Sequence, residues 1–284
     1  MWLTLSISAC ISYGTLVVLQ RVIAVESKNP RATSIIFNLW CIVFSFLLFL
    51  PKGFGEFRIP ENPLAYIYLL IAALGYGLFE RWRMRASQLV DASSGAVISN
   101  IGVVIAFIGS VVLAGESLRL EQVAGALLIL FALLLVSYQK KNGASSISPR
   151  AVMGALGIYA LMGLGWMFDQ SGSRSFSPSF YMMLVWTVPF LFLVFPIISR
   201  KDLLQVSRDA GWKLLILASL NVLGYYFQVQ ALEIEKASFV IPVVNFSTLV
   251  AVLSGMFFLH ERGGIVRKLF GAVLAILGIM CIVR

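Results

Sequence analysis

Charged residues are scarce in this sequence. Only 12% of the 284 residues are Asp, Glu, Lys or Arg, whereas soluble domains average about 25%. Hydrophobic residues make up 60% of the chain and the mean hydropathy is +0.92. A water-soluble fold of this composition would expose far too much apolar surface. The composition therefore excludes an ordinary soluble domain and favours a chain that lies in a bilayer.

Cysteine and histidine are also rare, with three Cys and one His in the whole chain. Cys10, Cys41 and Cys281 lie inside apolar runs without CxxC spacing, which argues against a disulfide framework or a metal site. The sequence contains no P-loop, HExxH or GxSxG motif. We therefore expect no metal, no cofactor, no enzymatic activity and no ATP-driven pumping by this chain.

The charge that is present is mostly positive, with a formal net charge of +9. Lys and Arg occur in short blocks between apolar runs, such as Lys140-Lys141 and Arg200-Lys201. This pattern is typical of cytoplasmic loops beside anionic lipid head groups, rather than of a nucleic-acid-binding surface. We expect membrane lipids and a small-molecule substrate as partners, no nucleic acid, and a monomeric protein.

Long apolar runs dominate the rest of the sequence. A helix needs about 20 apolar residues to cross the hydrocarbon core of a bilayer. The first run carries no basic segment before it, so we interpret it as a span rather than a cleaved signal peptide. The sequence predicts an all-α, polytopic membrane protein with ten transmembrane helices near 2–20, 32–50, 64–85, 93–113, 121–138, 151–170, 179–199, 212–231, 238–259 and 266–283.

The two halves of the chain repeat each other. In the second and seventh runs, residues 146 positions apart match, as Trp40 does with Trp186. In the fourth and ninth runs the spacing is 145, and it pairs Asn100 with Asn245. Each half holds five spans, an odd number, so the second copy must enter the membrane from the opposite side. Such inverted repeats are common in secondary transporters, whose substrate site lies near the bilayer midplane.

The repeat also sets the domain organisation and the orientation. We expect a first five-helix repeat at 1–138, a polar linker at 139–150, and a second repeat at 151–284. Most of the 22 Lys and Arg residues fall in the loops after the odd-numbered spans. By the positive-inside rule, both termini lie outside the cytoplasm, and we expect the inner (cell) membrane of a bacterium.

Two stretches carry a resemblance to a known family. Each has a small-residue start, a long apolar span, a Glu at its end and a Gly-Ala opening the next span, at 92–126 and 237–272. This doubled pattern resembles the EamA-type transporters of the drug/metabolite transporter superfamily. The resemblance implies export or exchange of small metabolites by way of a central cavity lined mainly by spans 1, 3, 4, 6, 8 and 9. It also implies cytoplasmic termini, which conflicts with the charge distribution.

Glu80, Arg81 and Arg83 are the most informative polar residues. The repeat pairs them with Tyr225, Tyr226 and Gln228 of the apolar eighth span, which favours a position within the membrane, facing a cavity or a partner. Glu80 and Arg83 share a helix face with Tyr76 and could hold the two ends of a zwitterion. The alternative is that the third span ends near Phe79 and that the charges form an interfacial cluster.

Other residues complete the predicted substrate site. The paired amides Asn100 and Asn245 could bind a polar solute or hydrogen-bond between helices. Pro242, one turn before Asn245, is the predicted hinge, because a proline frees a backbone carbonyl. Trp40 and Trp186 lie mid-span and could stack on a flat solute or pack against helices and lipid, and Trp166 is expected to line the cavity. The predicted substrate-binding residues are Glu80, Arg83, Tyr76, Asn100, Trp166, Tyr225, Gln228 and Asn245, and the candidates for ion coupling are Glu80 and Asp169.

The sequence therefore predicts a secondary transporter of a small polar metabolite, such as an amino acid, working by alternating access. Two alternatives remain open. An integral-membrane lipid-handling protein would need a lateral opening between helices. A non-transporting membrane scaffold would have a sealed interior, with Glu80 and Arg83 at the aqueous rim.

Overall fold

The computed structural model describes residues 1–56, 59–105, 108, 119–137, 148–235, 240, 243–260 and 264–282. Within these ranges the chain forms helices and no strands, which confirms the predicted all-α membrane fold. The helices are α1 (Trp2–Glu26), α2 (Pro30–Glu56), α3 (Pro63–Leu89), α4 (Ala92–Ile98), α6 (Leu120–Ser137), α7 (Pro149–Ser175), α8 (Pro178–Val194), α9 (Arg200–Ile234), α11 (Ser247–Phe258) and α12 (Ile265–Ile282).

Six helices are long and apolar enough to cross a membrane by themselves: α1, α2, α3, α7, α9 and α12. Four shorter apolar helical segments, Ala92–Ile105, Leu120–Val136, Ser179–Val194 and Val243–Phe258, account for the remaining predicted spans. Many large apolar side chains on these helices are exposed, as expected when the outer surface meets lipid tails. The predicted linker lies largely outside the described residues, since 138–147 are not among them.

Local sequence explains several helix starts. The Asn62 side chain accepts a hydrogen bond from the Leu64 amide (3.0 Å), and Pro63 occupies the first helical position of α3. Asp91 accepts in the same way from the Ser94 amide (2.9 Å) at the start of α4. Both caps satisfy backbone amides that have no partner within the helix, and so they fix where α3 and α4 begin.

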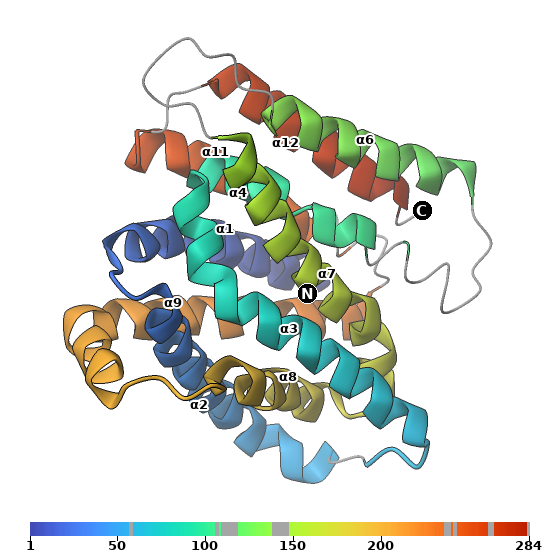
Figure 1. The fold of residues 1–284 in the computed structure, drawn as a ribbon. Helices are drawn as coiled ribbons and strands as arrows, with labels where there is room; N and C mark the ends of the chain where they lie inside the picture. Colours follow the sequence, from blue (N-terminus) through green and yellow to red (C-terminus); the bar gives the residue numbers. More distant parts are fainter. Residues whose placement is uncertain are drawn as a thin grey trace.

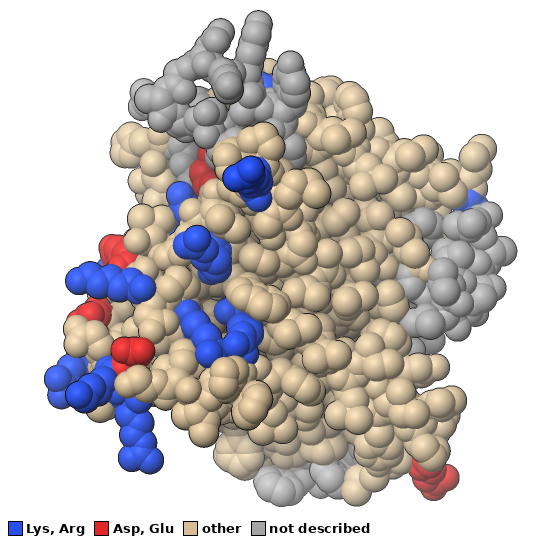
Figure 2. Space-filling model, viewed as in Figure 1, with Lys and Arg blue, Asp and Glu red and all other residues tan. Residues whose placement is uncertain are grey.

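The helices form a bundle with a helix pair at each end (Figure 1). The pair α6 and α12 lies at one end, the pair α2 and α8 lies at the other, and the remaining helices pack between them. Lys and Arg gather at one side of this bundle, around the start of α9, while most of the visible surface is uncharged (Figure 2). This distribution is that of a protein whose middle lies in hydrocarbon and whose charged side faces water.

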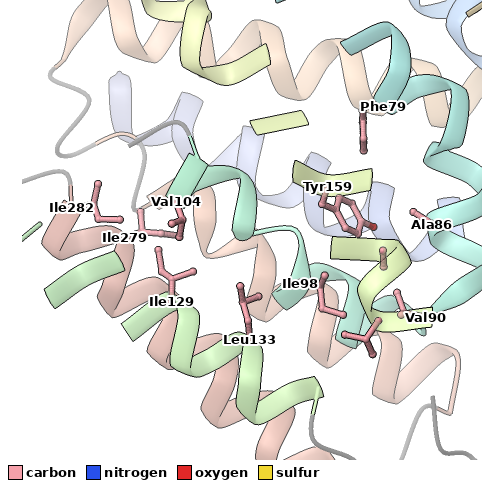
Figure 3. Packing of buried hydrophobic residues seen from close by; sticks show 12 residues of the cluster. Phe79, Ala86, Val90, Ile98, Val104, Ile129, Leu133, Tyr159, Ile279 and Ile282 are labelled. Carbon is pink, nitrogen blue, oxygen red and sulfur yellow. The ribbon is translucent and has the colours of Figure 1, made fainter. Parts of the chain in front are cut away.

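The helix contacts obey the two-fold exchange that an inverted repeat predicts. In the repeat, α1 corresponds to α7 and α3 corresponds to α9. The counterpart of the α3–α7 contact is therefore the α9–α1 contact, and both contacts are extensive. The pairs α2–α8, α4–α11 and α6–α12 each join equivalent helices of the two halves. A buried cluster from α3, α4, α6, α7 and α12, including Phe79, Tyr159 and Ile279, fills the space between the halves (Figure 3).

The α6–α12 pair is close because each helix presents a glycine to the other. A Cβ on Gly278 would overlap the Gly125 carbonyl oxygen, and a Cβ on Gly125 would overlap the Gly278 carbonyl oxygen. We expect Gly278→Ala to lower the free energy of unfolding by about 1–3 kcal/mol, because overpacking forces the backbones apart. The matched control is Gly157→Ala on α7, where an added Cβ meets nothing within 4 Å. Equal denaturation midpoints for the two variants in detergent would contradict this packing argument.

Candidate functional site

One face of α3 carries three buried polar side chains, those of Glu80, Arg83 and Ser87. Tyr76, Glu80, Arg83 and Ser87 lie at helical spacing on the same face. The side chains are well buried: Glu80 is 3% exposed and Arg83 is 6% exposed. The helix continues to Leu89, so Glu80 and Arg83 lie inside it rather than beyond its end.

Glu80 and Arg83 form a buried ion pair. Arg83 Nη1 lies 2.7 Å from Glu80 Oε1. Arg83 Nε donates to Gln20 Oε1 of α1 at 2.7 Å, and the guanidinium lies over the Phe37 ring of α2, 4.5 Å from its centroid. The charge is thus held by a carboxylate, an amide and an aromatic face, which compensates its removal from water. The second carboxylate oxygen, Glu80 Oε2, is buried and has no hydrogen-bond partner.

The polar chain continues from Gln20 toward the charged side of the bundle. Gln20 Nε2 donates to Ser87 Oγ at 2.5 Å, and Arg21 donates to the Ser87 carbonyl oxygen. Ser87 also borders a small hollow, lined by Val17, Arg21, Ser87, Val90, Asp91, Ala92, Gly95 and Tyr159. Hydrogen bonds therefore connect this hollow, by way of Ser87 and Gln20, to the buried ion pair.

Spans four and nine each contain a short turn, at positions that lie close to each other in the repeat. Helix α4 ends at Ile98, Ser99 and Asn100 form a turn, and helix resumes at Ile101. In the second half, residues 243–245 are helical, Phe246 is in a turn, and α11 begins at Ser247. Asn100 Nδ2 donates to the carbonyl oxygens of Ala96 (3.1 Å) and Val97 (3.0 Å), which satisfies the end of α4. Ser99 and Phe246 both keep helical backbone angles, so each span is kinked rather than unwound.

Tyr76 and Trp166 lie close together where α3, α7 and the residues after α4 meet. A Cβ on Gly165, next to Trp166, would overlap the Tyr76 ring, and a Cβ on Gly102 would lie 3.1 Å from the Trp166 ring. These contacts place the Tyr76 ring beside Gly165 and the Trp166 ring beside Gly102, two residues after Asn100. Glu80 is one turn along α3 from Tyr76.

The remaining predicted residues are placed less closely around the ion pair. Tyr225 and Gln228 are half-buried in the second half of α9, and Asn245 is half-buried just before α11. Asp169 falls on α7, but its side chain is outside the described part of the structure, and so is Pro242. Their roles as coupling residue and hinge remain predictions.

A second buried ion pair lies at the charged side. Lys268 Nζ of α12 is 2.6 Å from Asp91 Oδ2 and donates to Ser93 Oγ at 2.8 Å. The Lys268 side chain is only 4% exposed, and that of Asp91 is 18% exposed. Because Asp91 also caps α4, this pair connects the last helix to the start of the fourth span.

The two sides of the bundle are packed differently. The repeat pairs Gln20 with Trp166 and Arg83 with Gln228. Gln20 and Arg83 are buried and hold α1 against α3, whereas Trp166 and Gln228 are half-buried. Within the described residues, α7 and α9 do not form a contact comparable to that between α1 and α3. The contact between Gln20 and Arg83 therefore closes the charged side between α1 and α3.

Sequence reasoning missed several members of this network. Gln20 stands in the first apolar run, Asn38 in the second, Asn221 in the eighth and Lys268 in the tenth. Each is a polar residue within an apolar span, and such residues usually face a partner or a cavity. That signal could have found them, although it could not have named their partners. Among the described residues, no group of three or more His, Cys, Asp or Glu side chains is arranged to hold a metal ion.

Fold and site together define a class of protein. The chain is a polytopic membrane protein built from two inverted five-helix repeats, with a buried polar network that joins α1 and α3. The sequence model of the EamA-like transporter family matches residues 1–138 and again residues 149–284. The chain therefore belongs to the EamA-like transporter family, as the resemblance implied, and it is a membrane transporter of the drug/metabolite transporter superfamily.

A solved structure, described only as the crystal structure of a protein, has a similar fold. Its TM-score is 0.59 with 16% sequence identity, and the match covers 99% of this chain and 95% of the other. At this identity the likeness supports the fold alone. The search of curated proteins found no match.

Proposed function

We propose that this protein is a secondary transporter that carries a small polar metabolite, of the size and charge of an amino acid, by alternating access. The single observation that carries the proposal is the buried Glu80–Arg83 ion pair, in which the second carboxylate oxygen, Glu80 Oε2, accepts no hydrogen bond. A zwitterion brings one positive and one negative group. It can therefore engage both side chains without adding net charge to the membrane interior.

The direction and sidedness of transport are part of the proposal. The charged side, closed by the Gln20–Arg83 and Lys268–Asp91 contacts, is the cytoplasmic side by the positive-inside rule, with both termini outside and the protein in a bacterial inner membrane. The buried contact between Gln20 of α1 and Arg83 of α3 supports a conformation that is closed on this side. Export or exchange then requires the α1–α3 contact to separate while α7 and α9 close.

Coupling to an ion gradient is proposed to involve Glu80 or Asp169. Glu80 is the better supported of the two, because its carboxylate is buried and half of its hydrogen-bonding capacity is unused. A proton on Glu80 would remove the charge that faces Arg83 and so weaken the contact between α3 and α1. This sequence of events links proton binding to opening of the closed side.

The test is solute flux in proteoliposomes. Purified protein is reconstituted, and uptake and exchange of radiolabelled amino acids, nucleobases and small organic ions are measured with and without a pH gradient. We expect saturable flux of at least one zwitterionic solute, well above that of empty liposomes. Absence of flux for every solute under every gradient would overturn the proposal, and lipid scrambling without solute flux would favour a lipid-handling protein.

A further inference from the structure

A group of buried polar atoms without partners lies between α2, α3, α8 and α9, and it extends beyond Glu80 to residues that the predicted substrate site did not include. The amide of Asn38 has no hydrogen bond from either Nδ2 or Oδ1, and Asn221 Nδ2, Trp186 Nε1 and Glu80 Oε2 also lack partners. Asn38 is 0% exposed, Asn221 7% and Glu80 3%. We refer to Asn38, Asn221, Trp186 and Glu80 as the orphan polar cluster.

Contacts with intervening residues bring this cluster together. The Cys41 side chain lies close to the side chains of Asn221 and Glu80. Cys41 follows Asn38 by one helical turn on α2. The Phe37 ring meets the Trp186 ring edge-on, with centroids 6.5 Å apart. The Arg83 guanidinium also lies over the Phe37 ring. The unsatisfied groups therefore surround one segment of α2, from Phe37 to Cys41, beside the ion pair.

Such a cluster is costly in a packed helical interior. Leaving a buried donor or acceptor unsatisfied costs about 1–3 kcal/mol for each group, and native interiors satisfy nearly all of them. Asparagine contributes nothing to apolar packing that leucine would not provide at similar volume. The unsatisfied atoms are thus best explained by a polar guest that binds them during the transport cycle.

The character of the atoms identifies the guest. Three neutral N–H donors, on Asn38, Asn221 and Trp186, accompany two acceptor oxygens, on Asn38 and Glu80. The charges nearby, Glu80 and Arg83, already neutralise each other. A neutral group with both an acceptor and a donor, such as a carboxamide or a hydroxyl, satisfies this set without introducing an unpaired charge.

We propose that the orphan polar cluster is a subsite for the uncharged, hydrogen-bonding side group of the transported solute. The inference rests on the proposed function and deepens it, because it assigns specificity to Asn38 and Asn221. Asn38 lies on the second span and Trp186 on the seventh, and neither span is among the six that the family resemblance gives as cavity lining. The subsite makes the transporter selective for polar over apolar solutes of the same size.

The test compares near-isosteric amino acids. Binding of L-asparagine and of L-leucine to the purified protein in detergent is measured by Trp fluorescence and by calorimetry. We expect the wild-type protein to bind L-asparagine at least tenfold more tightly, since a polar site rejects an analogue that leaves its groups unpaired. We expect Asn38→Leu and Asn221→Leu each to reduce that preference about tenfold. Ser45→Ala is the matched control, because Ser45 is a buried α2 residue whose hydroxyl bonds within its own helix, to the Ile42 carbonyl (2.9 Å).

Stability measurements make the result unambiguous. Both leucine variants are expected to fold and to melt at or above the wild-type temperature, because each removes unsatisfied buried polar atoms. A raised melting temperature with unchanged preference would mean that the cluster holds internal water, and would overturn the subsite. Failure of the wild-type protein to prefer L-asparagine would also overturn it. Either result concerns the subsite alone. The transporter proposal is tested separately by solute flux in proteoliposomes, and absence of flux would overturn it.

Discussion

Replacing Arg83 with methionine is expected to lower the free energy of unfolding by about 3–5 kcal/mol and to abolish solute flux. Methionine removes the only cation paired with Glu80 in the described structure and leaves a carboxylate 3% exposed among apolar helices. An uncompensated buried charge is the costly product, since its hydration is lost and nothing replaces it. The loss also frees Gln20 Oε1 from its 2.7 Å hydrogen bond to Arg83 Nε, which loosens the contact between α1 and α3.

Two further variants separate stability from transport. The double variant Glu80→Gln with Arg83→Met buries no charge, so we expect it to recover most of the lost stability while solute flux stays at background. Arg85→Met is the matched control, because Arg85 is exposed on the same helix and its side chain bonds only to the Gln88 side chain in the described structure. We expect it to change the free energy of unfolding by less than about 0.5 kcal/mol. Denaturant unfolding in mixed micelles and flux in proteoliposomes measure both effects.

The outcome for the double variant decides how the ion pair acts. Recovery of both stability and flux would show that the pair has a structural role only, and it would remove the central support for the proposed solute site. Equal effects of Arg83→Met and Arg85→Met would instead mean that Arg83 lies in water. The scaffold hypothesis, with these charges at the aqueous rim, would then be preferred.

The second large effect concerns the Lys268–Asp91 pair. Asp91→Ala is expected to cost about 3–5 kcal/mol, and Lys268→Met is expected to cost less. Removing Asp91 leaves an ammonium whose side chain is 4% exposed and also deletes the cap of α4. Removing Lys268 leaves a carboxylate that is 18% exposed and still accepts from the Ser94 amide. Leaving the more deeply buried charge without its partner costs more free energy of unfolding. The lost helix cap adds about 1 kcal/mol.

An exposed pair offers the matched comparison. Lys213 and Glu26 lie 2.5 Å apart, but their side chains are 26% and 55% exposed. Lys213→Met should change stability by less than about 1 kcal/mol, because water screens the pair. Unfolding midpoints of the three variants test the order Asp91→Ala, Lys268→Met, Lys213→Met from largest to smallest loss. A larger loss for Lys213→Met than for Asp91→Ala would refute the assignment of Lys268 to the protein interior.

Much of the fold was predictable because a bilayer constrains the sequence so strongly. Apolar runs of about 20 residues, polar connections and a repeat that matched Asn100 with Asn245 led to ten spans in two inverted halves. The exchange of α3–α7 for α9–α1 in the structure agrees with that prediction. What the sequence could not supply was the length of each helix. The turn near Asn100 has its counterpart near Phe246, and both depend on where backbone carbonyls find partners rather than on hydropathy.

The candidate site was also predictable only in part. Glu80 and Arg83 were visible in the sequence because ionisable residues in an apolar span are rare, and their i, i+3 spacing already placed them on one face. Their partners were not visible. Gln20 and Ser87 lie 67 positions apart in the chain, and no local pattern joins them. The neighbours of Asn38 depend on how α8 and α9 pack against α2, which is a long-range property.

The amino-acid sequence alone determined that this chain inserts in a membrane as two oppositely oriented five-helix units. Hydropathy is a local property of the chain, and the odd number of spans in each half follows from counting the apolar runs. Only the tertiary structure decided which buried polar atoms find partners and which do not. Hydrogen bonds and ion pairs form over about 3 Å, and that distance is set by the packing of helices from both halves. The closed charged side, the polar chain from Ser87 to Glu80, and the unsatisfied amides around Asn38 all follow from that packing.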